Sequence, residues 1–275
     1  MMRRRLKAIG IYVGIIFVVL VMGFPLYWMV KTSVEPPTSL FSPPYSYIPR
    51  TFSGENYRLL LFETYFLTFL KNSVIVAFFC TLISVIVSTL AGYGLTRFEF
   101  PGKKLIARGT LFSYMFPPLM LGIPLYIIFD RLGLRNTYVG LILAHASIGI
   151  PLGTWIMWQY FQIVPKSLEE AAWVSGASRM RTLREVVLPI ATPGIITVST
   201  FAFAFSWNDY TYAKIFQDDI TMFTVTTGIN SFVERTAVHW GLIQAGATLI
   251  TIPTLIIIVF LQRQLLESMA VGGLK

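Results

Sequence analysis

Hydrophobic positions along this chain gather into six long stretches, and shorter polar segments separate them. A helix needs about 20 mostly apolar residues to cross a bilayer. Six stretches reach that length, roughly 9–30, 67–95, 105–129, 139–160, 190–212 and 240–262. Prolines interrupt several of them, which membrane helices tolerate because neighbouring helices and waters satisfy the freed backbone groups. The pattern predicts an all-α membrane protein with six transmembrane helices.

The composition agrees with this class. The 275 residues are 55% hydrophobic and 13% charged, with a mean hydropathy of +0.67, whereas soluble domains carry about 25% charged residues. The basic start resembles the n-region of a signal peptide, but the apolar part after it is long enough to span and no A-x-A site follows. We expect an uncleaved first transmembrane helix. Spacings of the GxxxG type, which permit close helix packing, occur at Gly10/Gly14 and Gly149/Gly153.

Lysines and arginines outside the spans are unevenly distributed, and their excess predicts the orientation. With the N-terminus inside, 14 of the 22 basic residues and 5 of the 13 acidic residues fall on the cytoplasmic side, which gives +9 there and zero outside. The basic residues on that side are Arg3, Arg4, Arg5, Lys7, Arg97, Lys103, Lys104, Arg108, Lys166, Arg179, Arg181, Arg184, Arg263 and Lys275. The net charge of +9 is therefore a topology signal and not a nucleic-acid footprint. Both termini are predicted in the cytoplasm, and the loop at 31–66 is predicted outside.

The longest cytoplasmic loop, about 161–189, is rich in charge and small residues, and its first part "PKSLEEAAWVSG" predicts a short helix. Ser167 and Glu170 have the spacing of a capping box, in which each side chain accepts from an orphan backbone donor. Gly176 can take the left-handed conformation that ends a helix. A rigid helix outside the spans suits the docking of a soluble partner.

A second helix is predicted after the glycine. Ser178 is placed to cap it, and Arg181 is placed to pair with Glu185 four residues later. Pro189 marks the point where this helix is expected to bend into the next span. Its apolar face is predicted to hold Met180, Leu183 and Val187.

Sequence motifs for enzyme chemistry are missing. There is no phosphate-cradling G-x-x-x-x-G-K-[ST] and no G-x-S-x-G, and the two histidines, His145 and His239, stand far apart without a metal-binding motif. His145, within the fourth span, is either a polar pathway residue or a packing histidine bonded to a backbone carbonyl. Cys80 is expected to be a buried thiol. We predict a protein that is not an enzyme, so the energy for any work on a solute must come from elsewhere.

The stretch "EAAWVSGASRMRTLREVVLP" resembles the EAA motif of ABC-importer permeases, whose pattern is E-A-A, three residues, Gly, nine residues, Ile, one residue and Leu-Pro. Val186 replaces the isoleucine. "YGLTRFEFPGKK", "IPLYIIFDRLGLRNTYVGLIL" and "FAFSWNDY" also resemble inner-membrane permeases of maltose- and glycerol-phosphate-type carbohydrate importers. The resemblance covers nearly the whole chain.

This resemblance implies a type I ABC-importer permease fold, with 1–275 as one transmembrane domain in a bacterial or archaeal inner membrane. It implies a second permease subunit, two ATP-binding subunits and an extracytoplasmic solute-binding protein as partners, besides membrane lipid. ATP and magnesium would bind the ATPase, and this chain would bind no cofactor. The solute would be a sugar, an oligosaccharide or a related polar solute. The residues implied in ATPase coupling are Glu169, Glu170, Ala171, Ala172, Gly176, Leu188 and Pro189. Glu170 alternatively only caps its own helix, and both roles can coexist.

Four polar residues are candidates for the translocation pathway: Ser113, Tyr114, Asn208 and Asp209. The alternatives are core packing for the first two and ordinary polarity of a helix end for the last two.

A rival function is an ion-coupled secondary transporter, which should show intramembrane carboxylates or inverted repeats. No acidic residue lies centrally in a predicted span. A second rival is a non-transporting membrane anchor for an ATPase.

Overall fold

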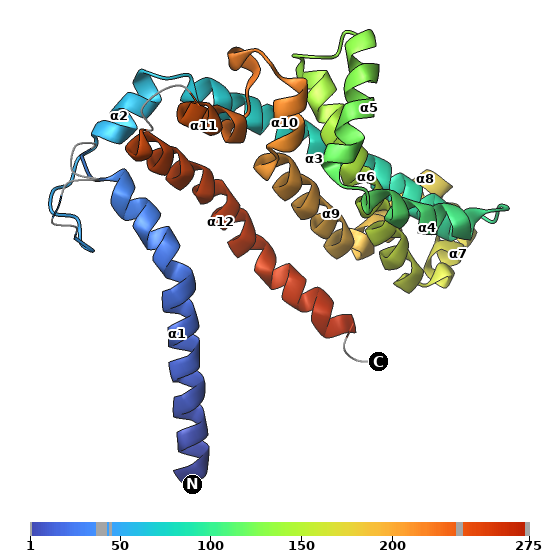
Figure 1. Ribbon diagram of the computed structural model, residues 1–275. Coiled ribbons are helices and arrows are strands. Elements are labelled where there is room, and N and C mark those ends of the chain that lie inside the picture. Colours follow the sequence, from blue (N-terminus) through green and yellow to red (C-terminus); the bar gives the residue numbers. More distant parts are fainter. Residues whose placement is uncertain (1, 37–42, 44–45, 235–238, 273–275) are drawn as a thin grey trace. The chain divides into compact units, whose positions relative to one another are not determined.

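The computed structural model describes residues 2–36, 43, 46–234 and 239–272, and the regular elements of these residues are all helical (Figure 1). The predicted all-α class is confirmed. Two compact units are distinguished: unit 1 comprises Met1–Leu67 and Ile229–Pro253, and unit 2 comprises Thr68–Gly228 and Thr254–Lys275. A single permease domain over 1–275 remains a prediction. Met1 and Lys275, which we expect in the cytoplasm, lie outside the described residues.

Unit 1 contains helix α1 (Met2–Ser33) and helix α2 (Glu55–Phe62). It also contains parts of α11 (Val225–Glu234) and α12 (Trp240–Gly272). Asn56 of α2 ties the end of α1 in place, since its side-chain nitrogen donates to the carbonyls of Ser33 at 3.0 Å and Glu35 at 2.7 Å. The helix α2, inside the loop expected at 31–66, was not predicted.

Unit 2 is built around helix α6 (Tyr138–Ile163), which contacts α4, α5, α9 and α10. The other elements are α3 (Phe66–Arg97), α4 (Lys103–Tyr114), α5 (Pro118–Arg131), α7 (Lys166–Val174), α8 (Arg179–Thr182), the π-helical turn η1 (Leu183–Val187), α9 (Leu188–Asn208), α10 (Thr211–Phe216) and the 3-10 turn η2 (Ile220–Met222). Two buried apolar clusters hold them together. One surrounds Leu141 and Tyr212, and the other surrounds Met157 and Val187.

Five helices of the described chain are long and apolar enough to cross a membrane: Ile9–Ser33, Phe66–Arg97, Tyr138–Ile163, Arg179–Asn208 and Trp240–Ile257. The remaining predicted span, 105–129, is not one helix. It consists of α4 and α5, which are bent by 99° at a short break. Pro117 and Pro118 cause the break, because proline lacks the helical N–H donor and pushes the residue before it out of the α conformation. Counting this pair as one span gives six.

The fifth span ends at Asn208, earlier than the predicted residue 212. Asp209 leaves the helical conformation, and its carboxylate accepts from the backbone N–H groups of Tyr212 at 3.3 Å and Ala213 at 3.0 Å. These bonds satisfy donors at the start of α10 that would otherwise lack partners. A new helix therefore begins where the span was expected to continue.

The GxxxG spacing in α6 marks a close approach of three helices. A Cβ atom at Gly153 would lie 2.4 Å from Ser88 Oγ on α3 and 2.9 Å from Val198 Cγ1 on α9. At Gly10 and Gly14 of α1, the added atom would meet nothing within 4 Å. The expected close packing is therefore found at the second pair and, within this chain, not at the first.

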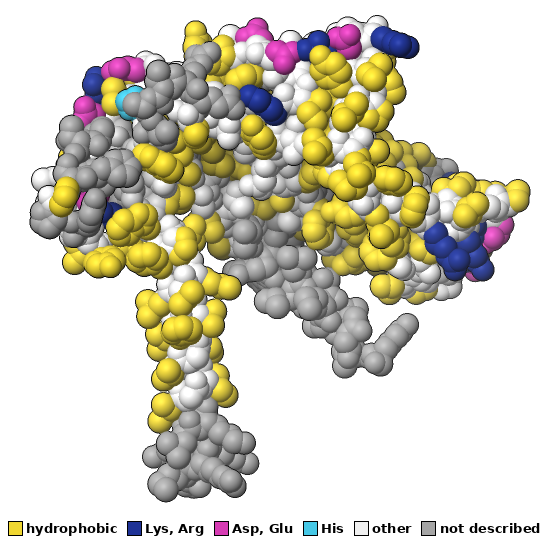
Figure 2. Space-filling view, viewed as in Figure 1, with side chains coloured by type: hydrophobic (Ala, Val, Ile, Leu, Met, Phe, Trp, Pro, Cys, Tyr) yellow, Lys and Arg dark blue, Asp and Glu magenta, His cyan; other side chains and the backbone are white. Residues whose placement is uncertain are grey.

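Hydrophobic side chains cover most of unit 2 on the face that Figure 2 shows, and charged side chains gather at two of its ends. Many large apolar side chains of the spans are exposed, including Ile123 at 66% and Phe78 at 58%. An apolar surface of this extent needs lipid or a partner subunit to cover it. The surface agrees with a protein that passes through the membrane several times.

Candidate functional site

The helix α7 lies in the loop that the sequence analysis singled out, and it starts two residues earlier than the predicted capping box requires. Pro165 is its N-cap in an extended conformation, and no side chain caps the helix. Ser167 lies inside the first turn, so the predicted capping box with Glu170 is wrong. The helix begins after the extended Pro165 instead, whose carbonyl accepts from the backbone N–H of Leu168 at 3.3 Å.

Glu169 is the buried residue of α7, with 1% of its surface exposed. Both of its carboxylate oxygens accept from α3. Tyr93 Oη donates to Oε2 at 2.8 Å, and Arg97 Nε donates to Oε1 in an ion pair. A buried carboxylate is expensive unless it is paired and hydrogen-bonded, and these two donors meet that requirement.

The guanidinium of Arg97 also holds the end of α6. Its Nη1 donates to the carbonyl of Phe161 at 3.1 Å, and its Nη2 donates to the carbonyl of Val164 at 2.9 Å. The last carbonyls of a helix have no partner within it, and a positive charge is favourable there because of the helix dipole. One side chain therefore joins the ends of α3 and α6 to the start of α7.

The opposite face of α7 is exposed and partly apolar. Leu168 and Val174 are 42% and 90% exposed, and Ala171 lies between them on the same face. Glu170 is also exposed, although it directly follows the buried Glu169, because successive residues of a helix are rotated by about 100°. Exposed apolar side chains on a helix outside the spans are typical of a docking surface.

Gly176 ends α7 as predicted, with φ at +86°. The backbone N–H of Gly176 donates to the carbonyl of Trp173 at 2.9 Å, and that of Ala177 donates to the carbonyl of Ala172 at 3.0 Å. This is the Schellman pattern, in which the left-handed residue follows the C-cap. An added Cβ would meet nothing within 4 Å, so the requirement for glycine comes from the backbone alone.

The predictions for the second helix are mostly confirmed. Ser178 Oγ accepts from the backbone N–H of Arg181 at 3.3 Å, and Arg181 pairs with Glu185 at 2.9 Å. Leu183 and Val187 are buried, as expected for the apolar face. Met180 is 59% exposed, so its place on that face was predicted wrongly. It lies in the first turn of α8, before the segment that packs against α6.

Leu188 and Pro189 follow a π-helical turn, and no gap in the helical structure separates α8 from the span. The Leu188 N–H donates to the carbonyl of Leu183, five residues back, and the helical segment from Arg179 to Asn208 is one candidate span. The predicted bend at Pro189 stays a prediction. Pro189 lies in the first turn of α9, where a missing N–H is tolerated.

A cleft of about 320 Å³ lies beside α7 at the junction with α3. Charges of both signs and three aromatic rings line it, and besides Tyr93 its lining includes Glu99, Glu170, Lys166, Arg179 and the rings of Phe98 and Trp173. The guanidinium carbon of Arg179 lies 5.7 Å from the ring centroids of both Phe98 and Trp173. Lys103, at 2.8 Å, holds the pKa of Glu99 below its usual range, so this carboxylate stays charged at neutral pH. Such a cleft suits charged side chains of a partner.

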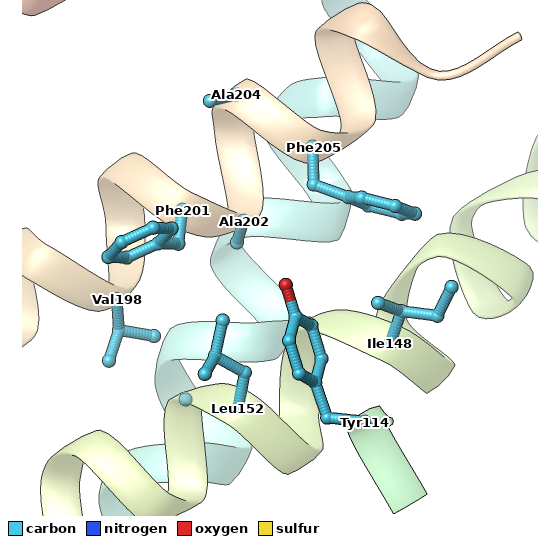
Figure 3. A pocket seen from close by; sticks show the side chains of 10 residues that line it. Tyr114, Ile148, Leu152, Val198, Phe201, Ala202, Ala204 and Phe205 are labelled. Atoms are coloured by element: carbon cyan, nitrogen blue, oxygen red, sulfur yellow. The ribbon is translucent and has the colours of Figure 1, made fainter. Parts of the chain in front are cut away.

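Tyr114 lies at the mouth of a second, mostly apolar cavity of about 290 Å³. Figure 3 shows its ring between Ile148 and Leu152, with the hydroxyl directed toward Ala202 and Phe205. Its neighbour Ser113 bonds to its own helix, donating to the carbonyl of Thr110 at 2.8 Å. The structure thus places one residue of this predicted pair at a cavity.

Asn208 and Asp209 lie in different surroundings although they are adjacent. Asn208 is exposed and donates to the carbonyl of Ala204 at 2.8 Å. Asp209 is buried and lies 3.1 Å from His145 Nε2, while His145 Nδ1 lies 2.8 Å from Ser206 Oγ. The histidine thus bonds to two side chains, not to the backbone carbonyl that we considered. No group of three or more His, Cys, Asp or Glu residues suited to a metal ion occurs among the described residues.

Residues 84–271 match the family model described as "Binding-protein-dependent transport system inner membrane component". This match covers more than half of the chain. The chain belongs to this family. The match confirms the prediction that this chain is a permease subunit of the inner membrane that works with a binding protein. It also agrees with the prediction that the chain is not an enzyme.

Named relatives of this inner membrane component include the trehalose/maltose transport system permease protein MalG of Thermococcus litoralis. It is 35% identical, and the match covers 98% of each chain. The trehalose transport system permease protein SugB of Mycobacterium tuberculosis is 32% identical over 93% of this chain and 94% of the relative. A chain of a bacterial ABC transporter involved in alginate import has the same fold, with a TM-score of 0.82 at 19% identity over 94% of this chain and 96% of that one. The predicted ABC-importer permease fold is confirmed.

Tyr93 and Arg97 are residues of this site that sequence reasoning missed. They lie four residues apart and therefore on one face of α3. Both fall in the stretch "YGLTRFEFPGKK", which we had quoted only for its resemblance to permeases. A tyrosine and an arginine at helical spacing at the end of a span were the available signal. Their partner, Glu169, is 72 residues from Arg97 and could not be identified from spacing.

Proposed function

We propose that this permease subunit carries a sugar or an oligosaccharide across the membrane, driven by ATP hydrolysis in a separate subunit. Trehalose and maltose in the names of its relatives support a carbohydrate solute. The complete complex would contain a second permease, two ATPase subunits that bind ATP and magnesium, and the solute-binding protein. Both ends of this chain would lie in the cytoplasm.

The observation that carries the proposal is the exposed, partly apolar face of α7 with the carboxylate of Glu170 beside it. We call α7 the coupling helix. It would lie in a groove of the ATPase, with Glu170 toward basic residues there, while Ala171 and Ala172 keep its surface flat. Gly176 would set the angle between α7 and α8, and Leu188 with Pro189 would continue the segment into α9. A short rigid helix transmits displacement better than a flexible loop.

The solute pathway is proposed to pass Tyr114, because its hydroxyl is the polar group directed into the cavity of Figure 3. Ser113 and Asn208 remain pathway predictions. The buried contacts of Asp209 with His145 and with the start of α10 favour a structural role for this residue over a direct contact with solute.

Cysteine labelling tests the proposed orientation. In a Cys80→Ala background, Thr51→Cys in the outer loop and Ser167→Cys on the coupling helix replace one exposed side chain each. A membrane-impermeant maleimide should label the first in intact cells and the second in inside-out vesicles. Labelling of both from the same side would contradict the orientation.

Reconstitution tests the energy source. Proteoliposomes that contain the permease pair, the ATPases and the binding protein should accumulate radiolabelled trehalose or maltose only with ATP and magnesium inside the compartment that holds the ATPases. A Walker-lysine variant of the ATPase is the matched control, because that lysine contacts the nucleotide phosphates. Uptake driven by an ion gradient without ATP would establish the secondary-transporter alternative, and nucleotide hydrolysis without uptake of any tested carbohydrate would favour a mere anchor.

A further inference from the structure

We propose that Arg97 and Tyr93 fasten the coupling helix to α3, so that a displacement of α7 by the ATPase moves this span directly. The inference rests on the proposed docking of α7. It adds a route that does not follow the chain, because the covalent route from α7 leads only into α6 on one side and through Gly176 into α8 on the other.

The charge pattern on α7 separates docking from fastening. Glu169 and Glu170 are adjacent carboxylates, but one is buried against α3 and the other is exposed. A carboxylate that served only to keep the loop soluble would not be buried at 1% exposure, because burial of a charge is unfavourable unless specific partners compensate for it. The buried member of the pair therefore has a task inside the permease, and the exposed member is left for the partner protein.

The donor geometry makes the attachment rigid. Glu169 is held at both oxygens, by Arg97 and by Tyr93 at 2.8 Å, and the two remaining arms of the guanidinium bond to carbonyls of α6. An arginine side chain presents its donors in a fixed planar fork, so several bonds made at once restrict its orientation. The Tyr93 ring also packs edge-on against Phe161, with 5.7 Å between the ring centroids. A shift of α7 alone would break the bonds of both Tyr93 and Arg97 to Glu169.

The same loop provides a comparison pair. Arg181 and Glu185 form an ion pair whose side chains are 65% and 60% exposed. Exposed ion pairs of this kind contribute little to the stability of a fold. Both members belong to the same helical segment, so they cannot link α7 to a span. Glu185→Gln is therefore a matched control for Glu169→Gln.

The test measures whether α7 and α3 move together in the complete complex. Spin labels on Ser167→Cys of α7 and Leu90→Cys of α3, both at exposed positions outside the junction, report the distance between the helices in nanodiscs. The background is Cys80→Ala, and the probe is a non-hydrolysable ATP analogue with magnesium. In the otherwise unmodified complex, the distance distribution should stay narrow and unchanged when the analogue binds. In Glu169→Gln it should broaden or shift, and in Glu185→Gln it should not.

Uptake provides the second readout. Glu169→Gln should still bind the ATPase, because the exposed face of α7 is unaltered, but carbohydrate uptake per ATP hydrolysed should fall about tenfold, within the range for residues that modulate coupling. Tyr93→Phe, which removes one hydroxyl, should give a smaller loss of the same kind. Tyr93→Phe can be measured in place of Glu169→Gln if the latter variant does not reach the membrane. Arg97→Lys should retain more coupling than Arg97→Met.

Two results would overturn the proposal: an inter-label distance that changes with nucleotide in the unmodified complex, or variants with normal distance distributions and normal uptake per ATP. Failure of the docking role itself would look different. The spectrum of the Ser167 label alone should show immobilisation when the ATPase binds, and its absence would refute docking whatever the distances are.

Discussion

Replacement of Gly176 by valine is expected to reduce carbohydrate uptake to background while the protein still inserts into the membrane. The glycine has φ at +86°, a region that costs an L-residue about 1–2 kcal/mol and a β-branched residue more. The surroundings leave room for a side chain, so the strain is relieved by rotation of the backbone and not by movement of neighbours. That rotation changes the angle between α7 and α8, and with it the orientation of the docking face. Uptake and ATPase pull-down at matched membrane expression measure the effect.

Two variants control for this experiment. Gly176→Asn should keep most of the uptake, because asparagine tolerates the left-handed conformation. Gly133→Val places the same strain in another loop, since Gly133 also has a positive φ, at +67°, and open surroundings, and it should leave ATPase association unchanged. Normal uptake in Gly176→Val would show that the loop is not the coupling element.

A single methyl group at Gly92 is expected to destabilise the permease strongly. The added Cβ of Gly92→Ala would lie 2.7 Å from Met157 Cβ and 2.9 Å from both the Met157 carbonyl carbon and the Trp158 nitrogen of α6. Two of these atoms belong to the backbone of a helix, which cannot move aside as a flexible side chain can, so α3 and α6 must separate. Overpacking of this kind costs about 1–3 kcal/mol or more. The purified complex should lose its monodisperse gel-filtration peak at a temperature several degrees lower.

The control lies two residues away on the same helix. At Gly94 the added Cβ would approach nothing closer than 3.8 Å, the distance to Phe98 Cδ2. Gly94→Ala should therefore be neutral or slightly stabilising, because alanine favours a helix over glycine by about 1 kcal/mol. Equal thermal stability of the two variants would contradict the close approach of α3 and α6 at Gly92.

The sequence was most informative about features that depend on local signals. The positive φ at Gly176 and the cap at Ser178 each depend on a few consecutive residues, and both predictions agree with the structure. The break at Pro117–Pro118 was visible as two prolines, but its angle of 99° depends on how α4 and α5 pack against α6 and α10. The capping box was predicted wrongly because Pro165, two positions before Ser167, is the N-cap of the helix.

Contacts between distant segments were beyond this reasoning. The motif draws attention to Glu170, whereas the buried contact is made by Glu169, and only the rotation of α7 against α3 distinguishes the two. Asp209 was considered for the solute pathway or for simple polarity of a helix end. In the structure its carboxylate caps α10 and contacts His145, a combination that requires three helices to be placed first.

The π-turn at Leu183–Val187 has a consequence for how tightly the length of this loop is constrained. A turn closed over five residues holds one residue more than an ordinary α-helical turn. This surplus residue is accommodated locally, so the helical segments before and after it stay in phase. An insertion or deletion within α7 or α9 would instead rotate every later side chain by about 100°. The segment between Gly176 and Pro189 therefore contains the one place in this part of the chain where length can vary by a residue while the orientation of the docking face is preserved.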